Sequence, residues 1–261
     1  MKFSGSYGIV YRINYNGFDS VIKFPKRKDL FDNITHEIKI YKKLCKSHDY
    51  SSYFPSVYYT GVFNESLMVS IDSEYILNNF IGAPCLILEY INGVTLDNVR
   101  VHRKNARKIY NGISNILDFL KSSRIVYNDM KPDNFILQNN QCIRCVDLGL
   151  ARTISKRFRD TSKFIGTPRY SSIHSHTSNT LDYSDDKESL IYMISYLVNG
   201  NLPWCNKCSL KDIYVSKLIS KVPEICCGIK WLSEELIKVK GFTWINNKVG
   251  EFFNEVPPFL T

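Results

Sequence analysis

The sequence has no long apolar segment, no internal repeat and no extended linker. None of its segments approaches the roughly 18 uninterrupted apolar residues of a transmembrane helix, so we expect no membrane partner. The residues after Met1 lack the apolar core of a secretory signal, which predicts an intracellular protein of the cytoplasm or nucleus, or of a host cell if the source is viral. That compartment is reducing, so we expect the eight cysteines to be thiols. The absence of a long heptad segment predicts a monomer.

Two Cys-x-x-Cys pairs, Cys142/Cys145 and Cys205/Cys208, raise the question of a zinc site, because close thiolates hold zinc in ribbons and fingers. The gap between the pairs is too long for one compact finger. Cys145 also lies in an alternating, strand-like segment, where a buried cysteine is an ordinary core residue. We therefore expect structural cysteines rather than metal ligands.

The composition is that of a globular protein with excess positive charge. Hydrophobic residues make up 44% of the 261 positions and aromatic residues 13%, enough for a large core. The chain has 34 Lys and Arg against 25 Asp and Glu, so its formal net charge is +9, which attracts anions. A nucleic-acid-binding protein is one hypothesis, but no interleaved aromatic and basic motif is present, so we do not expect nucleic acid as a partner.

Hydrophobic periodicity predicts an α+β fold in two parts. Residues 1–91 contain strand-like runs around one amphipathic helix, and residues 92–261 are mostly helical. The expected strands cover residues 8–14, 19–24, 57–63 and 85–89, and the expected helix covers residues 33–45. In the second part, one helix ends before Ser122. Another, over residues 186–199, is apolar on every side with Gly200 as its stop, so we expect it at the centre of a lobe.

Two features near the N-terminus are compatible with phosphate binding. Gly5 and Gly8 lie three residues apart before the β-branched Val10, so the backbone could approach a phosphate there, although any glycine-containing hairpin would look the same. Lys23 ends an apolar strand, and Glu37 on the following helix could hold its side chain. The alternative for this second pair is two solvated surface charges.

The strongest pattern is a loop that contains Asp129, Lys131 and Asn134, followed by an Asp147-x-Gly turn. Asp129 offers a base, Lys131 a cation for phosphate, Asn134 a metal-binding amide and Asp147 a metal-binding carboxylate. Phosphoryl transfer requires this set of groups. A polar turn and a buried strand would explain each piece separately, but not all of them in order with a lysine and a glutamate upstream.

In these motifs the sequence resembles the eukaryotic protein kinases, and more narrowly the casein kinase I group, which includes the vaccinia-related kinases. Residues 131–137 are similar to the catalytic loop of that group, and residues 166–176 are similar to its replacement for the usual Ala-Pro-Glu motif. The resemblance extends from Gly5 to about Asn254. It implies a bilobal kinase domain, with a small β-rich N-lobe over residues 1–91 and a larger, mostly helical C-lobe over residues 92–261.

The resemblance also implies roles for the matching residues in a reaction that uses ATP and Mg. The implied nucleotide-binding residues are Gly5, Gly8, Val10, Lys23, Leu88, Glu89 and Ile91. The implied catalytic residues are Asp129, Lys131, Lys23 and Glu37, and the implied metal ligands are Asn134 and Asp147. Asp129 would accept the proton of the substrate hydroxyl, while Asp186 would brace the catalytic loop from the buried helix.

The same resemblance suggests a substrate class. Lys131 and Thr167 are similar to the corresponding residues of serine/threonine kinases. Between Asp147 and Tyr170, six cationic residues stand against two acidic ones, so we expect acidic or already phosphorylated protein substrates. A solvated basic loop with no selective role is the alternative.

The match departs from the family at two places. The family's first glycine falls at Phe3, so we expect the first strand to be truncated or missing. This leaves a pseudokinase that acts as a binding or scaffold module as the alternative, although every charged catalytic position is filled. Asn128 replaces the arginine that receives a loop phosphate in many kinases, so we expect activity without phosphorylation of Thr161, Ser162 or Thr167.

Overall fold

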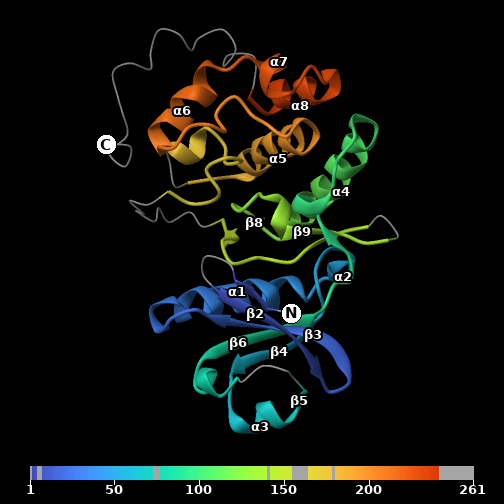
Figure 1. Cartoon of the computed structure of the whole chain (residues 1–261), viewed down its shortest axis with the longest axis vertical. Coiled ribbons are helices and arrows are strands. Elements are labelled where there is room, and N and C mark those ends of the chain that lie inside the picture. Colours follow the sequence, from blue (N-terminus) through green and yellow to red (C-terminus); the bar gives the residue numbers. More distant parts are fainter. Residues whose placement is uncertain are drawn as a thin grey trace. The chain divides into compact units, whose positions relative to one another are not determined.

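The computed structural model describes residues 2–4, 8–72, 77–139, 142–154, 164–177 and 180–240, with side chains from residue 8 onward. The chain divides into two compact units, each visible in Figure 1. Unit 1 comprises Met1–Gly93 and Gln138–Gly149, and unit 2 comprises Val94–Leu137 and Leu150–Thr261. The sequence placed one boundary after residue 91 and did not predict that residues 138–149 rejoin unit 1. Periodicity does not show which unit a short strand joins.

Unit 1 is built on an antiparallel sheet with strand order β1-β2-β3-β6-β4, and β5 pairs with β2. The strands are β1 (Lys2–Ser4), β2 (Gly8–Tyr15), β3 (Phe18–Pro25), β4 (Val57–Val62), β5 (Ile71–Asp72) and β6 (Pro84–Glu89). All four expected strands are confirmed, with ends that differ by at most one residue. Where the sequence predicted a truncated or missing first strand, the three-residue β1 pairs with β2.

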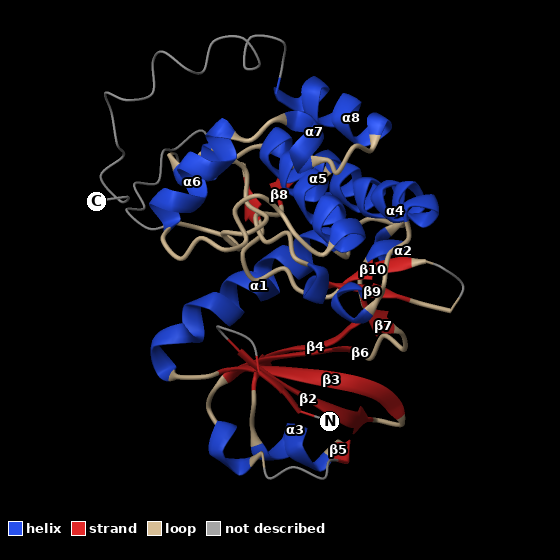
Figure 2. Cartoon of the chain, turned by 45° about the horizontal axis from the view of Figure 1, so that its top comes forward, coloured by secondary structure: helices blue, strands red, loops and turns tan. Residues whose placement is uncertain are grey.

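The helices of unit 1 cover both faces of this sheet. They are α1 (Phe31–Leu44), α2 (Tyr50–Tyr53) and α3 (Glu65–Val69), with 3-10 turns η1 (Lys28–Leu30) and η2 (Asn78–Phe80). Figures 1 and 2 show α1 on one side of the sheet and α3 on the other, and α1 packs against β3 and β6. On the side of α3, Phe24 stacks on Phe80 with ring centroids 4.2 Å apart. The expected amphipathic helix is thus confirmed, and its buried side includes Glu37.

The hairpin between β2 and β3 determines the register of the strand that carries Lys23. Asn16 and Gly17 both have positive φ (50° and 84°), as the central residues of a tight two-residue turn require. The Asn14 carboxamide accepts a hydrogen bond from the Gly17 amide at 2.8 Å. Val10 therefore pairs with Lys23. The remaining strand of the unit, β10 (Ile143–Cys145), packs against α2, so Cys145 is a buried core residue.

Unit 2 is mostly helical. Its helices are α4 (Arg103–Ser122), α5 (Tyr183–Asn199), α6 (Leu210–Ile219), α7 (Val222–Ile225) and α8 (Lys230–Lys240). Its short strands are β7 (Val94–Thr95), β8 (Ile125–Val126), β9 (Phe135–Leu137) and β11 (Arg152–Thr153), with 3-10 turns η3 (Leu96–Asn98), η4 (Pro132–Asn134) and η5 (His174–His176). β7 pairs with β9 and β8 with β11, both antiparallel. In the described part of the chain, no helix combines the length and apolar composition needed to cross a bilayer.

Helix α5 is the central helix of unit 2. A capping box starts it, because the Asp182 side chain accepts from Ser184 N while the Asp185 side chain accepts from Asp182 N. Gly200 ends it in the left-handed conformation with φ 73°. Residues 190–194 are fully buried, and the helix packs against both α4 and α8. The prediction of a buried helix that stops at Gly200 is confirmed, although residues 196–198 are only half-buried.

Candidate active site

In unit 1, three charged residues from distant parts of the sequence meet in one cluster. Lys23 Nζ lies 2.7 Å from Glu37 Oε2 and 3.1 Å from Asp147 Oδ1. The Glu37 side chain is only 2% exposed, whereas that of Asp147 is 34% exposed. Two solvated surface charges therefore do not describe Lys23 and Glu37. Asp147 is therefore the more solvent-accessible of the two carboxylates in this cluster.

The cluster keeps Lys23 charged and holds the Asp147-Leu148-Gly149 turn. Burial by itself would lower the pKa of Lys23, but the Asp147 and Glu37 carboxylates outweigh it, so the pKa of Lys23 is raised. The Leu148 amide donates to Glu37 Oε1 at 3.3 Å, and the Gly149 amide donates to Asp147 Oδ1 at 2.9 Å. A fixed ammonium beside a fixed carboxylate can bind phosphate oxygens and a metal ion, respectively.

Three of the other implied nucleotide-binding residues, Gly8, Val10 and Leu88, lie on the same sheet. A Cβ on Gly8 would lie 3.2 Å from Lys23 Cε and 3.0 Å from Phe24 O, so a larger residue would crowd the lysine. Leu88 pairs with Val21 on β3 and is buried. Gly5 lies outside the described residues.

Of Glu89 and Ile91, which the resemblance places at the adenine, Glu89 has structural partners in unit 1 and Ile91 is buried. The Glu89 carboxylate accepts from the Ser56 amide at 3.0 Å and from Arg144 at 3.3 Å. Ile91 is 3% exposed. The carboxylate of Glu89 is therefore engaged by the fold, so any contact of this segment with a nucleotide falls to other atoms.

In unit 2, the Asp129 carboxylate is held by three side chains. Lys131 Nζ lies 2.7 Å from Asp129 Oδ2, and the Thr167 hydroxyl donates to Asp129 Oδ1 at 2.9 Å. Asn134 Nδ2 donates to Asp129 O at 2.9 Å, to Asp129 Oδ2 at 3.1 Å and to the Tyr127 hydroxyl at 2.9 Å. These contacts use the amide nitrogen of Asn134 and leave its Oδ1 as the atom suited to a cation.

The backbone of this loop is braced from α5. The buried Asp186 carboxylate accepts from the Tyr127 amide at 2.7 Å and from the Asn128 amide at 2.9 Å. Burial raises the pKa of Asp186 to about 7, against the opposing effect of those two amides. Asn128 has φ 67°, and its Nδ2 donates to Leu150 O at 3.1 Å. Gly166 packs so closely that a Cβ there would lie 2.7 Å from Asn128 O.

Comparison with known proteins identifies the family of this chain. The family model described as "Protein kinase domain" matches residues 4–240. The chain belongs to the protein kinase family. It is 25% identical to casein kinase I homolog 3 of Schizosaccharomyces pombe over 250 residues, which is 86% of this chain and 52% of that protein. It is 27% identical to casein kinase I homolog 2 of the same yeast, with the same coverage. The predicted resemblance and the kinase fold class are thereby confirmed.

The similarity to other casein kinase I proteins varies in extent. A 36% identity to casein kinase 1-like protein HD16 of Oryza sativa subsp. japonica covers 106 residues, 34% of this chain and 14% of that protein. The chain spans about half the length of the two yeast relatives. Activity and substrates are therefore inferred below from the residues of this kinase domain.

Sequence reasoning missed a support behind the turn that begins at Thr167. Lys217 on α6 is fully buried, and its Nζ donates to Pro168 O at 2.7 Å and to Ser171 O at 2.6 Å. Trp204 Nε1 donates to Arg169 O between them, at 2.7 Å. The carbonyls of this turn are thus held by side chains from two later segments. The available signal was spacing, since Lys217 follows the buried Ile213 by one helical turn.

His176 lies in the same buried group, and we expect it to destabilise this kinase domain as the pH falls. Burial, together with the adjacent Lys217, lowers the pKa of His176 to about 2, so the folded ring stays neutral while the unfolded ring titrates near 6.5. At this ring the unfolded state binds more protons between pH 6.5 and 2, so the contribution of His176 to stability falls as the pH falls. From pH 7 to pH 5 this contribution to the free energy of unfolding decreases by about 2 kcal/mol. The raised pKa of Asp186 acts in the opposite direction over the same range.

Urea titrations at the two pH values measure this effect. His176→Gln should remove most of the contribution, whereas His102→Gln, at an exposed histidine of the same unit, should leave it unchanged. The same change in the free energy of unfolding between the two pH values in wild type and in His176→Gln would contradict the assignment.

Proposed function

We propose that the chain is a serine/threonine protein kinase that transfers the γ-phosphate of ATP to hydroxyls of protein substrates. The observation that carries this proposal is the buried ion pair of Lys23 and Glu37, extended to Asp147. Burying these charges costs desolvation free energy that a packed apolar group would avoid, and nothing in the sheet requires them. This arrangement, together with an oriented Asp129, favours a catalyst over a pseudokinase that only binds partners.

The described residues fit ATP and Mg. Asp147 and Asn134 offer carboxylate and amide oxygens, the ligand type that Mg²⁺ prefers, and Lys23 and Lys131 offer cations for phosphate oxygens. No group of three or more His, Cys, Asp or Glu that could hold a metal lies among the described residues. Mg²⁺ that binds together with a nucleotide usually has few protein ligands. When bound, the ion would neutralise charge on the phosphates.

In the proposed reaction, Asp129 orients the substrate hydroxyl and accepts its proton. Its two oxygens are oriented by Thr167 and Lys131, so the carboxylate needs no rearrangement before the proton moves. Lys131 then balances negative charge at the transferred phosphoryl group. Because Lys131 and Thr167 are similar to the corresponding residues of serine/threonine kinases, we favour serine and threonine over tyrosine.

Two finer features belong to the same proposal. We propose acidic or phosphorylated substrates, which the excess of basic residues between Asp147 and Tyr170 supports, although residues 155–163 lie outside the described residues. We also propose activity without loop phosphorylation. The side-chain Nδ2 of Asn128 already donates to Leu150 O. An asparagine also carries no positive charge that could bind a phosphate on the loop.

A radiolabelled ATP assay on casein, plain and pre-phosphorylated, tests the proposal. We expect Mg-dependent transfer by phosphatase-treated wild type, stronger transfer to the phosphorylated casein, and a loss on the order of 100-fold or more in Asp147→Asn. Asp32→Asn, at an exposed aspartate of α1, is the matched control and should stay active. No transfer by wild type with ample Mg and ATP would favour the pseudokinase.

A further inference from the structure

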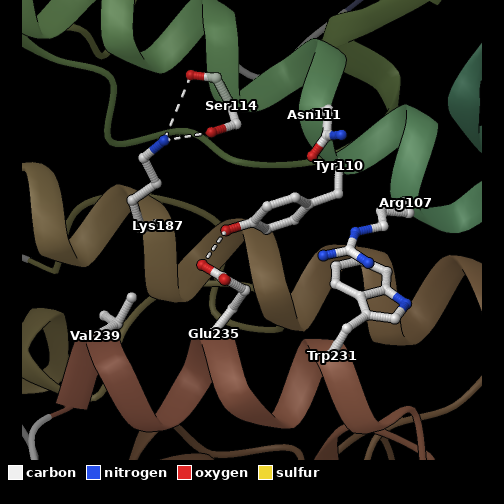
Figure 3. Close-up of a pocket in the computed structure, with 8 residues that line it drawn as sticks. All are labelled: Arg107, Tyr110, Asn111, Ser114, Lys187, Trp231, Glu235 and Val239. Atoms are coloured by element: carbon white, nitrogen blue, oxygen red, sulfur yellow. Dashed lines mark hydrogen bonds between the residues drawn. The ribbon is translucent and has the colours of Figure 1, made fainter.

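Unit 2 contains a hollow that the proposed reaction does not use. Helix α5 packs against both α4 and α8, and the side chains of these three helices enclose about 360 Å³ (Figure 3). The lining residues are Arg107, Tyr110, Asn111, Ser114, Lys187, Trp231, Glu235 and Val239. The volume is at the small end of the range for ligand sites, so it admits one or two side chains rather than a nucleotide.

The carboxylates at this hollow are already neutralised within the fold. Glu235 pairs with Lys238 at 2.8 Å and accepts from the Tyr110 hydroxyl at 3.3 Å. Lys187 pairs with Asp118 at 3.0 Å and also donates to the Ser114 hydroxyl, as Figure 3 shows for the serine. Negative charge at the site is therefore compensated by neighbouring donors.

Arg107 is the group at the hollow that remains without a counter-ion. Its guanidinium carbon lies 5.4 Å from the Trp231 ring centroid, and Tyr110 meets the same ring edge-on at 5.3 Å. Among the described residues, Arg107 makes no hydrogen bond or ion pair, so its N–H donors are open to a ligand. The cation–π contact with Trp231 favours positions of the guanidinium over the ring, which lowers the entropy lost when an anion binds.

The helix that carries Arg107 is unusually basic at its start. Residues 100–108 contain five Lys and Arg and no acidic residue. Cations in the first turn oppose the helix dipole, and the first turn of α4 has no acidic residue to offset them. These cations lower the stability of α4. A role in binding anions would explain why they are present there.

We propose that this hollow docks an acidic peptide segment of a partner protein. One aromatic or aliphatic side chain of the peptide packs against Trp231, and its carboxylates pair with Arg107 and the cations that precede it on α4. The charge complementarity selects an acidic chain, and the aromatic wall selects an apolar anchor within it. Docking requires neither ATP nor phosphoryl transfer, so this inference stands apart from the proposed kinase activity.

Fluorescence polarisation of a fluorescein-labelled peptide, acetyl-Glu-Asp-Glu-Phe-Glu-Asp-Glu, tests the proposal with the full chain and without ATP. We expect saturable binding that weakens about tenfold in Arg107→Glu, since both the attraction and the donors are lost. Lys39→Glu reverses an exposed charge on α1 of unit 1 and should bind nearly as well as wild type. Replacing the phenylalanine of the peptide by alanine should weaken binding several-fold.

Three results with the peptide alone would overturn the docking site. They are no binding by wild type, equal binding by wild type and Arg107→Glu, and equal losses in Arg107→Glu and Lys39→Glu. Displacement of the peptide by oligodeoxythymidine of the same charge, at the same concentration as by unlabelled peptide, would indicate a general polyanion surface and would also overturn it. Thermal unfolding verifies that both variants fold. A kinase assay on the same samples separates failure of docking from failure of the proposed activity.

Discussion

Asp129→Asn is expected to reduce phosphoryl transfer to a protein substrate by a factor on the order of 10²–10⁴, the usual contribution of a positioned base. Asparagine keeps the size of the side chain and an oxygen for the Thr167 hydroxyl. It cannot accept the substrate proton, and it places a second donor against Lys131 or Asn134, where a carboxylate oxygen now accepts from both. Initial rates at saturating ATP should therefore fall, while ATP affinity measured by calorimetry should change little.

The same loop offers a matched control for this experiment. Asp133 is exposed and lies four residues after Asp129, so Asp133→Asn makes the same chemical change without touching the proposed base. We expect it to retain activity close to wild type. Full activity in Asp129→Asn would show that the reaction does not depend on this carboxylate. A loss of ATP affinity in Asp129→Asn as large as its loss of transfer rate would assign the residue a role in nucleotide binding.

The residues that the sequence identified are those whose chemistry forces them close together along the chain. One short loop must present a base, a cation and a metal-binding amide, so Asp129, Lys131 and Asn134 stand within six positions and can be recognised as a motif. The strands and the buried helix were predictable for a related reason. Periods of two and of 3.6 residues record which side of an element is buried, and Gly200 records where α5 must stop.

Contacts between segments that lie far apart in the sequence produce no such local pattern. Residues 138–149 joined unit 1 because β10 packs on α2, which no periodicity reveals. The hollow beside Trp231 draws its lining from three helices between residues 107 and 239, so no linear motif marks it. The resemblance assigns Glu89 to the segment at the adenine, and it does not show that the carboxylate of Glu89 binds Ser56 and Arg144. Partner choice of this kind depends on tertiary packing, and single-sequence patterns do not contain it.

Lys217 is the residue whose role was hardest to predict from the sequence, because a lysine is normally solvated and this one is fully buried. We expect Lys217→Met to lower the free energy of unfolding by about 3 kcal/mol. Methionine fills similar space but donates nothing, so Ser171 O loses its buried donor. Pro168 O keeps only the Ser171 hydroxyl, at 3.2 Å. The lower cost of burying methionine offsets part of this loss. Urea denaturation measures the change in the free energy of unfolding. Lys211→Met, at an exposed lysine of the same helix, should leave that free energy unchanged.

The same substitution should also affect catalysis through the turn it supports. Thr167 holds Asp129 from the start of this turn, and Lys217 holds the two carbonyls that follow. When the turn loosens, the KM for the protein substrate should rise several-fold while the KM for ATP stays near the wild-type value, because Lys217 lies in unit 2 and touches none of the proposed nucleotide-binding residues. Lys217→Arg, which restores donors, should recover part of both effects. Unchanged stability in Lys217→Met would show that the two carbonyls find other donors and that the turn does not depend on α6.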